Sequence, residues 1–102
     1  MSDTLSITLE TSIVRADDRL VTAAMDGDLA MMDLEKSAYY ALDSIGVEIW
    51  EQIETPLTVD ALCDRLTSRF DVSREQCEAD ILPFLRRLYA REIIRIVAPE
   101  SD

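Results

Sequence analysis

Hydrophobic and polar residues alternate along much of the N-terminal half of the chain with the two-residue period of β-strands. Residues 20–25 and 28–34 show this alternation. They flank Asp26-Gly27, a pair that favours a two-residue type I′ turn because both positions need a positive φ. A second turn leads to residues 37–42, whose tyrosines suit a third strand. The pattern therefore predicts an antiparallel meander with residues 37–42 at one edge.

The two-residue turn also predicts the register of the hairpin. Val21 is expected opposite Met32, and Thr22 opposite Met31 on the other, more mixed side of the sheet, because successive side chains of a strand point to opposite faces. Residues 5–9 also alternate and are expected to form a further short strand.

From Asp43 onward the hydrophobic period becomes helical. A short amphipathic helix is expected to begin at Asp43 or Ser44 and to end at Thr55-Pro56, because the residue before a proline disfavours the helical conformation. Thr58 is a suitable N-cap for a second helix that continues to Phe70.

A third helix is expected from about residue 74 to about residue 91. Ser73 followed by Gln76 forms a capping box at its start. Pro83 removes one helical hydrogen bond, so we expect a kink there and a single helix, since the hydrophobic pattern continues in phase across it. Residues 93–97 are expected to form a closing strand or an extended wing.

This third helix has a wider hydrophobic face than one contact with a small core needs. Four residues form a core stripe at helical spacing: Cys77, Ile81, Phe84 and Leu88. Leu82, Leu85 and Tyr89 widen the hydrophobic face to roughly 160°. Two interpretations remain open here: the extra residues complete the core, or they form the wall of a groove for another molecule.

Three strands followed by three helices predict one α+β domain that is winged-helix-like, with a three-stranded antiparallel sheet. We expect the 102 residues to form this single domain, with its core at about residues 20–97. Hydrophobic residue types make up 48% of the sequence, which is enough to fold.

Charge and composition exclude several kinds of function. The net charge of −11 argues against binding to nucleic acid or to an anionic membrane. The sequence has no histidine, the commonest general base and metal ligand, and its two glycines cannot form a glycine-rich phosphate loop. We therefore expect no catalysis and no cofactor.

The cysteines and the N-terminus indicate no special chemistry. Cys63 and Cys77 have no histidine nearby and are expected as small buried residues, with no metal site and no disulfide. The first ten residues lack the pattern of a signal peptide, and no hydrophobic stretch has the length of a membrane span. A cytoplasmic location is the resulting expectation.

Several segments together resemble the PqqD-like family. They are, in order, YYALD at 39–43, GVEIW at 46–50, LTVDAL at 57–62, RFDV at 69–72, EADI at 78–81, and Phe84, Leu85 and Leu88. Members of this family are small leader-peptide-binding domains of ribosomal peptide biosynthesis, also called RiPP recognition elements. The resemblance covers about residues 20–97.

Within this family the chain is more similar to the stand-alone proteins that present lasso-peptide precursors to a leader peptidase. The Tyr-x-x-Leu-Asp and Gly-x-x-Ile-Trp segments favour them over the pyrroloquinoline quinone member, whose Pro-Glu pair before the third strand is absent here. Two positions depart from the family pattern. Asp43 stands where asparagine is usual, and Arg91-Glu92 stand where a glycine usually follows the last helix.

The resemblance implies that a leader peptide adds as a strand to the edge of residues 37–42 and lies against helix 74–91. The implied peptide contacts are Ala38, Tyr39, Tyr40 and Ala41 on the strand and Leu82, Leu85, Arg86 and Tyr89 on the helix. An open edge and an unused hydrophobic helix face suit strand addition on physical grounds as well. The sequence does not settle which of the two tyrosines faces the core.

The implied partners are a precursor leader peptide and a leader peptidase or other maturation enzyme, and the chain itself is expected as a monomer or weak homodimer. A competing hypothesis is a DNA-binding winged helix, but Glu75, Glu78 and Asp80 lie where base contacts normally fall. Three more hypotheses stay open at this point: an enzyme built on surface carboxylates, a module that binds a folded protein, and a precursor chaperone of the quinone pathway.

Overall fold

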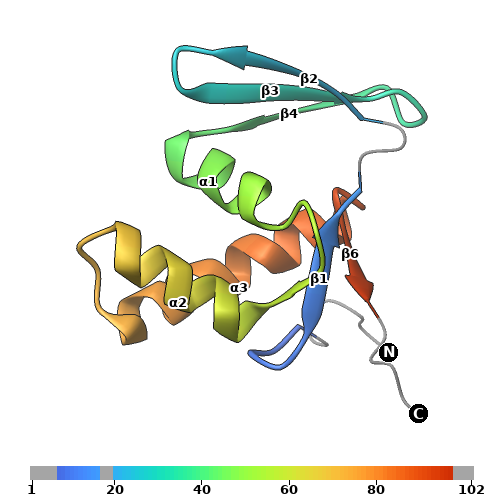
Figure 1. Cartoon of the computed structure of the whole chain (residues 1–102). Helices are drawn as coiled ribbons and strands as arrows, with labels where there is room; N and C mark the ends of the chain where they lie inside the picture. The colour runs from blue at the N-terminus through green and yellow to red at the C-terminus, as the bar shows by residue number, and fades with distance from the viewer. Residues whose placement is uncertain (1–6, 17–19, 98–102) are drawn as a thin grey trace.

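The structure, a computed structural model, describes residues 7–16 and 20–97 and contains three helices and six strands within them (Figure 1). The elements are, in chain order, β1 (Ser12–Arg15), β2 (Leu20–Met25), β3 (Asp28–Asp33), β4 (Ala38–Leu42), α1 (Ser44–Gln52), β5 (Leu57–Thr58), α2 (Val59–Arg69), α3 (Arg74–Ala90) and β6 (Ile94–Val97). The α+β class, the antiparallel meander and the three helices that follow it are confirmed.

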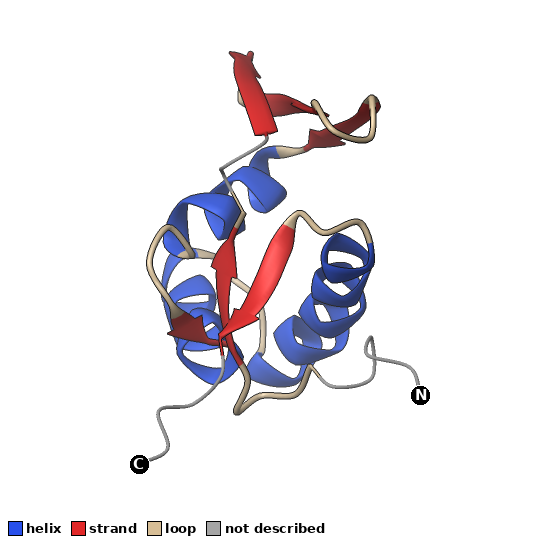
Figure 2. Ribbon diagram, turned by 90° about the vertical axis from the view of Figure 1, so that its right-hand side faces the viewer, coloured by secondary structure: helices blue, strands red, loops and turns tan. Residues whose placement is uncertain are grey.

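The strands form two sheets, whereas the sequence predicted one. The predicted meander is the sheet β2-β3-β4, and a second antiparallel sheet has the order β5-β1-β6 (Figure 2). The closing strand therefore pairs with β1, with Ile13 opposite Ile96, and not with the meander. β1 was not predicted. The strand expected at 5–9 is wrong for residues 7–9, which are turn and coil, and residues 5 and 6 lie outside the described residues.

The predicted hairpin is confirmed in turn and register. Asp26 has a φ of 49° and Gly27 a φ of 87°, as a type I′ turn requires. Val21 pairs with Met32, and Thr22 with Met31. This local agreement follows from the turn, which fixes the pairing of every residue behind it.

Side-chain caps begin each helix where the sequence predicts. The carboxylate of Asp43 accepts a hydrogen bond from the Gly46 N–H at 2.9 Å, so aspartate supplies the cap at the position where asparagine is usual. The hydroxyls of Thr58 and Ser73 accept hydrogen bonds from the backbone three residues later in α2 and α3. α3 runs through Pro83 as one helix, as predicted.

The end of α3 is a Schellman motif. The Ile93 N–H donates to the Leu88 carbonyl and the Glu92 N–H to the Tyr89 carbonyl, both at 2.9 Å. Glu92 has a φ of 61°, in the left-handed region that favours glycine. The departure from the family pattern therefore places a glutamate where the backbone suits glycine.

The core lies between the three helices and the inward faces of both sheets. Met31 and Leu42 are buried where the meander meets α1, and Leu85 and Leu88 of α3 are buried as well. The core also includes residues N-terminal to the meander, because Ile7 and Ile13 have no exposed surface. The helices and the second sheet thus form a base from which the β2-β3-β4 sheet projects (Figure 1).

Candidate functional site

The β4 strand forms an open edge of its sheet. The strand order β2-β3-β4 leaves one side of β4 without a strand partner among the described residues. On an edge strand, the backbone N–H and C=O groups of alternate residues point away from the sheet and are available to another chain. The predicted strand residues Ala38, Tyr39, Tyr40 and Ala41 all lie on this edge.

The two tyrosines of β4 point to opposite faces of the sheet. The Tyr39 residue is 62% exposed and lies opposite Met32, which lies opposite Val21 on β2, so these three side chains share the outer face. Tyr40 is half-buried and packs against the core, and the Arg91 guanidinium lies 5.3 Å from the centre of its ring. Tyr40 is therefore the inward tyrosine, which the sequence left open.

A groove opens beside the C-terminal end of β4. It is a cavity of about 710 Å³ between the end of β4, α1, the end of α2 and the part of α3 from Cys77 to Arg87. Its lining includes the exposed hydrophobic side chains of Ile45 and Phe70 and the half-buried side chains of Val72 and Phe84. Hydrophobic surface of this kind, next to an open strand edge, suits the side chains of an extended peptide.

Gly46 keeps part of this groove open. A Cβ at this position would lie 3.1 Å from the Leu42 Cβ and 3.4 Å from the Phe84 ring, so a larger side chain would fill the space between β4 and α3. A second, smaller cavity of about 240 Å³ lies under the start of β4, lined by Tyr40 and Arg91 among others. The two cavities flank β4 along its length.

The face of α3 that lines the cavities differs from the predicted one. It carries Asp80, Phe84, Arg87 and Arg91, which follow one another at helical spacing of four, three and four residues. The Arg87 guanidinium lies 5.7 Å from the centre of the Phe84 ring. The hydrophobic pattern placed Phe84 in the core stripe. Arg87 and Arg91 follow Phe84 at helical spacing, and this combination of an aromatic residue with two cations is the signal that could have identified the face.

The predicted helix residues lie elsewhere. Leu85 is fully buried in the core, which corrects the expectation that it lines a groove wall. Arg86 donates a hydrogen bond to the Ile7 carbonyl at 3.0 Å, so its flank of α3 is next to the N-terminal segment. Leu82 and Tyr89 are partly buried against the core, and none of these four residues lines either cavity. The hydrophobic pattern could not orient the helix, because hydrophobic residues stand on both flanks of the core stripe, Phe84 on one and Leu82 and Tyr89 on the other.

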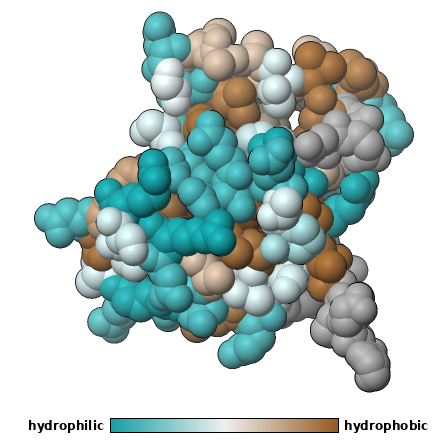
Figure 3. Space-filling model, viewed as in Figure 1, coloured by the Kyte–Doolittle hydropathy of each residue, from teal (hydrophilic) through white to brown (hydrophobic). Residues whose placement is uncertain are grey.

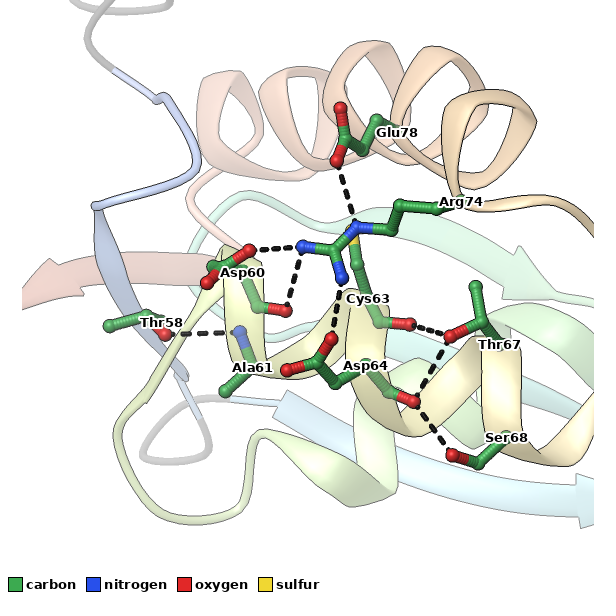
Figure 4. A network of polar contacts seen from close by, with 9 residues as sticks. All are labelled: Thr58, Asp60, Ala61, Cys63, Asp64, Thr67, Ser68, Arg74 and Glu78. Atoms are coloured by element: carbon green, nitrogen blue, oxygen red, sulfur yellow. Dashed lines mark hydrogen bonds and ion pairs between the residues drawn. The ribbon is translucent and has the colours of Figure 1, made fainter.

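The start of α3 is occupied by an ion-pair network that joins it to α2 (Figure 4). Arg74 contacts the carboxylates of Asp60, Asp64 and Glu78, and its Nε donates to Glu78 at 2.8 Å. The hydrogen bond with Glu78 is the largest of the effects that raise the pKa of Arg74 above its usual value. A cation surrounded by three carboxylates is poorly suited to contact a phosphate, which weighs against the DNA-binding hypothesis.

The cysteines are placed as predicted. Both are buried and unbonded, and burial, together with the neighbouring Cys77, raises the pKa of the Cys63 thiol to about 12. Within the described residues, no group of three or more cysteine and carboxylate side chains is arranged to hold a metal ion. In the same part of the chain, no helix combines the length and hydrophobicity that crossing a bilayer requires.

Hydrophobic residues gather over the part of the molecule that carries the β2-β3-β4 sheet, while the helical base is largely hydrophilic on the face shown in Figure 3. The open edge and the exposed sheet face therefore lie at this end of the molecule, and the hydrophobic groove lies between the sheet and the helical base.

Comparison with known proteins assigns the family. Residues 28–94 match the family described as coenzyme PQQ synthesis protein D (PqqD), and this segment contains β3, β4, the three helices and the start of β6. The chain belongs to the PqqD family. The resemblance read from the sequence is thus confirmed. No curated protein matches the chain.

A solved structure extends this finding to most of the PqqD-family chain. It is "TbiB1 in Complex with the TbiA(beta) Leader Peptide", 27% identical in sequence, with a TM-score of 0.72. The match covers 84% of this chain and all of the TbiB1 chain.

Proposed function

We propose that this protein captures the leader segment of a ribosomally made precursor peptide. The leader adds as a strand to the open edge of β4, and its side chains enter the groove against α3. The observation that carries the proposal is the position of the β4 edge, which runs between two cavities on a chain whose fold matches the leader-bound TbiB1 structure along the whole length of TbiB1.

Strand addition and side-chain anchoring supply different parts of the binding free energy. Backbone hydrogen bonds to β4 recognise any extended chain, whereas the pockets select the side chains at alternate positions. Ordering a flexible peptide costs on the order of 2–5 kcal/mol. The large cavity beside Ile45, Phe70 and Phe84 is where burial of a hydrophobic side chain would offset that cost.

The proposed contact set follows the geometry. The backbone of β4 at residues 38–41 pairs with the peptide, as the family resemblance implies. On α3, Phe84, Arg87 and Arg91 take the role that the sequence suggested for Leu82, Leu85, Arg86 and Tyr89, because the cavities are lined by the former. Tyr39 takes part through its backbone, since its side chain lies on the outer face of the sheet.

The protein acts by capture and delivery and catalyses no reaction itself. It holds the leader in an ordered form and presents a precursor, by family resemblance that of a lasso peptide, to a leader peptidase in the cytoplasm. Tethering raises the local concentration of the core peptide at the enzyme without a new contact. The family description also names coenzyme PQQ synthesis, so a precursor of that pathway is the second candidate ligand.

Hydrogen exchange of the strand edges tests the proposal. The probe is a synthetic leader of a short precursor peptide, chosen from those encoded near this gene. On binding, we expect alternate amides of β4 to become protected, because a new strand accepts hydrogen bonds from them. β2 is the internal control, because it is the other edge of the same sheet and borders the groove much less.

A second arm of the experiment uses the precursor leader of the quinone pathway. Protection of β4 by only one of the two peptides identifies the ligand class. Equal exchange of β4 with and without either peptide, at concentrations of about 100 μM, would refute leader capture at this edge.

A further inference from the structure

Most basic side chains of the described residues are already engaged. Their partners are carboxylates, a glutamine amide or a backbone carbonyl, and the residues are Arg15, Lys36, Arg65, Arg69, Arg74 and Arg86. Arg87 and Arg91 differ, because the structure gives their guanidinium groups only an aromatic ring as partner. In a chain with a net charge of −11, two arginines without a carboxylate partner are unexpected.

These two arginines line the same side of the proposed peptide site. Arg87 lies on α3, and Arg91 caps the C-terminal end of this helix one turn later. The aromatic partner of Arg87 is Phe84, which lines the groove, and that of Arg91 is Tyr40 of β4, which lines the smaller cavity. A cation held over a ring keeps a defined position, while its N–H donors remain free for an acceptor. Both arginines are exposed, so an incoming chain can reach them.

The spacing of the two arginines matches an extended chain. Four residues of an α-helix rise about 6 Å. Two residues of a β-strand rise about 6.6 Å, and such residues point to the same face. Side chains at positions i and i+2 of a strand that lies along α3 therefore meet Arg87 and Arg91 in turn.

We propose, on the basis of the proposed function, that Arg87 and Arg91 recognise acidic side chains of the bound leader, two positions apart in its sequence. Each guanidinium supplies charge-assisted hydrogen bonds to one carboxylate. The substrate class is thereby narrowed to leaders that carry Asp or Glu at i and i+2 within the segment that pairs with β4.

The acidic residues of the large cavity restrict the register of such a leader. Asp43, Asp71 and Asp80 line the large cavity together with Arg87, whereas Arg91 lines the smaller cavity beside Tyr40. An acidic pair placed there meets like charge, whereas the same pair beside Arg87 and Arg91 meets opposite charge. The charge pattern of the groove thus selects one position of the peptide along the edge.

Binding measurements with matched variants test this inference. The probe is the leader peptide that protects β4 in the exchange experiment, fluorescently labelled, together with versions in which its acidic residues are replaced by glutamine. We expect the R87Q/R91Q double variant to bind the unaltered leader at least about tenfold more weakly and with a flatter salt dependence. R65Q is the matched control, since Arg65 is an exposed arginine that lines neither cavity.

The outcomes separate this inference from the proposed function. Loss of binding in R87Q/R91Q, with no further loss when the peptide also carries glutamine, supports the pairing of arginine with carboxylate. Unchanged affinity of R87Q/R91Q, or a bound leader segment without acidic residues, overturns the recognition of acidic side chains by Arg87 and Arg91. If that leader still protects β4 amides from hydrogen exchange, leader capture at the β4 edge stands. No β4 protection by either peptide overturns both.

Discussion

Replacing Glu92 by glycine should stabilise this protein, although it removes a charged side chain that makes an ion pair. Glu92 follows α3 with a φ of 61°, and both hydrogen bonds of the Schellman motif depend on that conformation. A residue with a Cβ is disfavoured there by roughly 1–2 kcal/mol, whereas glycine is not.

Two effects oppose this gain. Glycine lowers stability by about 0.4–1 kcal/mol because it gives the unfolded chain more freedom. The Glu92 side chain is largely exposed, so the loss of its contacts, the 3.2 Å ion pair with Lys36 among them, costs about 0.5 kcal/mol in total. The net expectation is a gain of about 0.5 kcal/mol, or roughly 2–4 °C in melting temperature for a domain of this size.

A comparison with Glu92→Ala isolates the backbone contribution. Both substitutions remove the ion pair, but alanine keeps the disfavoured conformation, so E92A should be less stable than wild type and E92G more stable than E92A by about 1 kcal/mol. Thermal and urea unfolding followed by circular dichroism measure the difference. If E92G proved no more stable than E92A, the argument that residue 92 needs glycine geometry would be refuted.

Two further predictions concern the groove and the core. Ile45→Asp should weaken leader binding about tenfold or more, because it places a charge on the hydrophobic lining of the groove. Val21→Asp, at a similarly exposed position on the outer sheet face, is the control. Equal affinity of the two variants for the leader, measured by fluorescence polarisation, would exclude the groove as the binding site. The Cys63 thiol is buried and its pKa is raised to about 12, so it should stay protonated at pH 8. We expect it to react with iodoacetamide only when the chain unfolds. Rapid alkylation of the native protein would contradict the described burial.

The features that the sequence predicted correctly are local ones. Asp26-Gly27 determined a hairpin and its register, because the turn geometry depends on two adjacent residues. The caps at Thr58 and Ser73 were predictable for the same reason, since each hydrogen bond spans three residues. The family segments added the expectation that the β4 edge and α3 belong to one site.

The second sheet could not be predicted from the sequence, because it depends on contacts between distant segments. β1 pairs with strands more than 40 residues away, and its four residues carry too short a pattern to signal a strand on their own. The edge status of β4, in contrast, followed from its place at the end of the meander.

Only the tertiary structure decided which flank of α3 faces the groove. The helical period shows that Leu85 and Arg87 lie on different faces, but it does not orient the helix against the sheet, because each flank of the core stripe carries a hydrophobic residue, Phe84 on one and Leu82 on the other. The N-terminal segment covers one flank at Arg86, which leaves Phe84, Arg87 and Arg91 facing β4. The sequence thus determined the elements and their faces, whereas the packing of distant segments determined which face is free to bind.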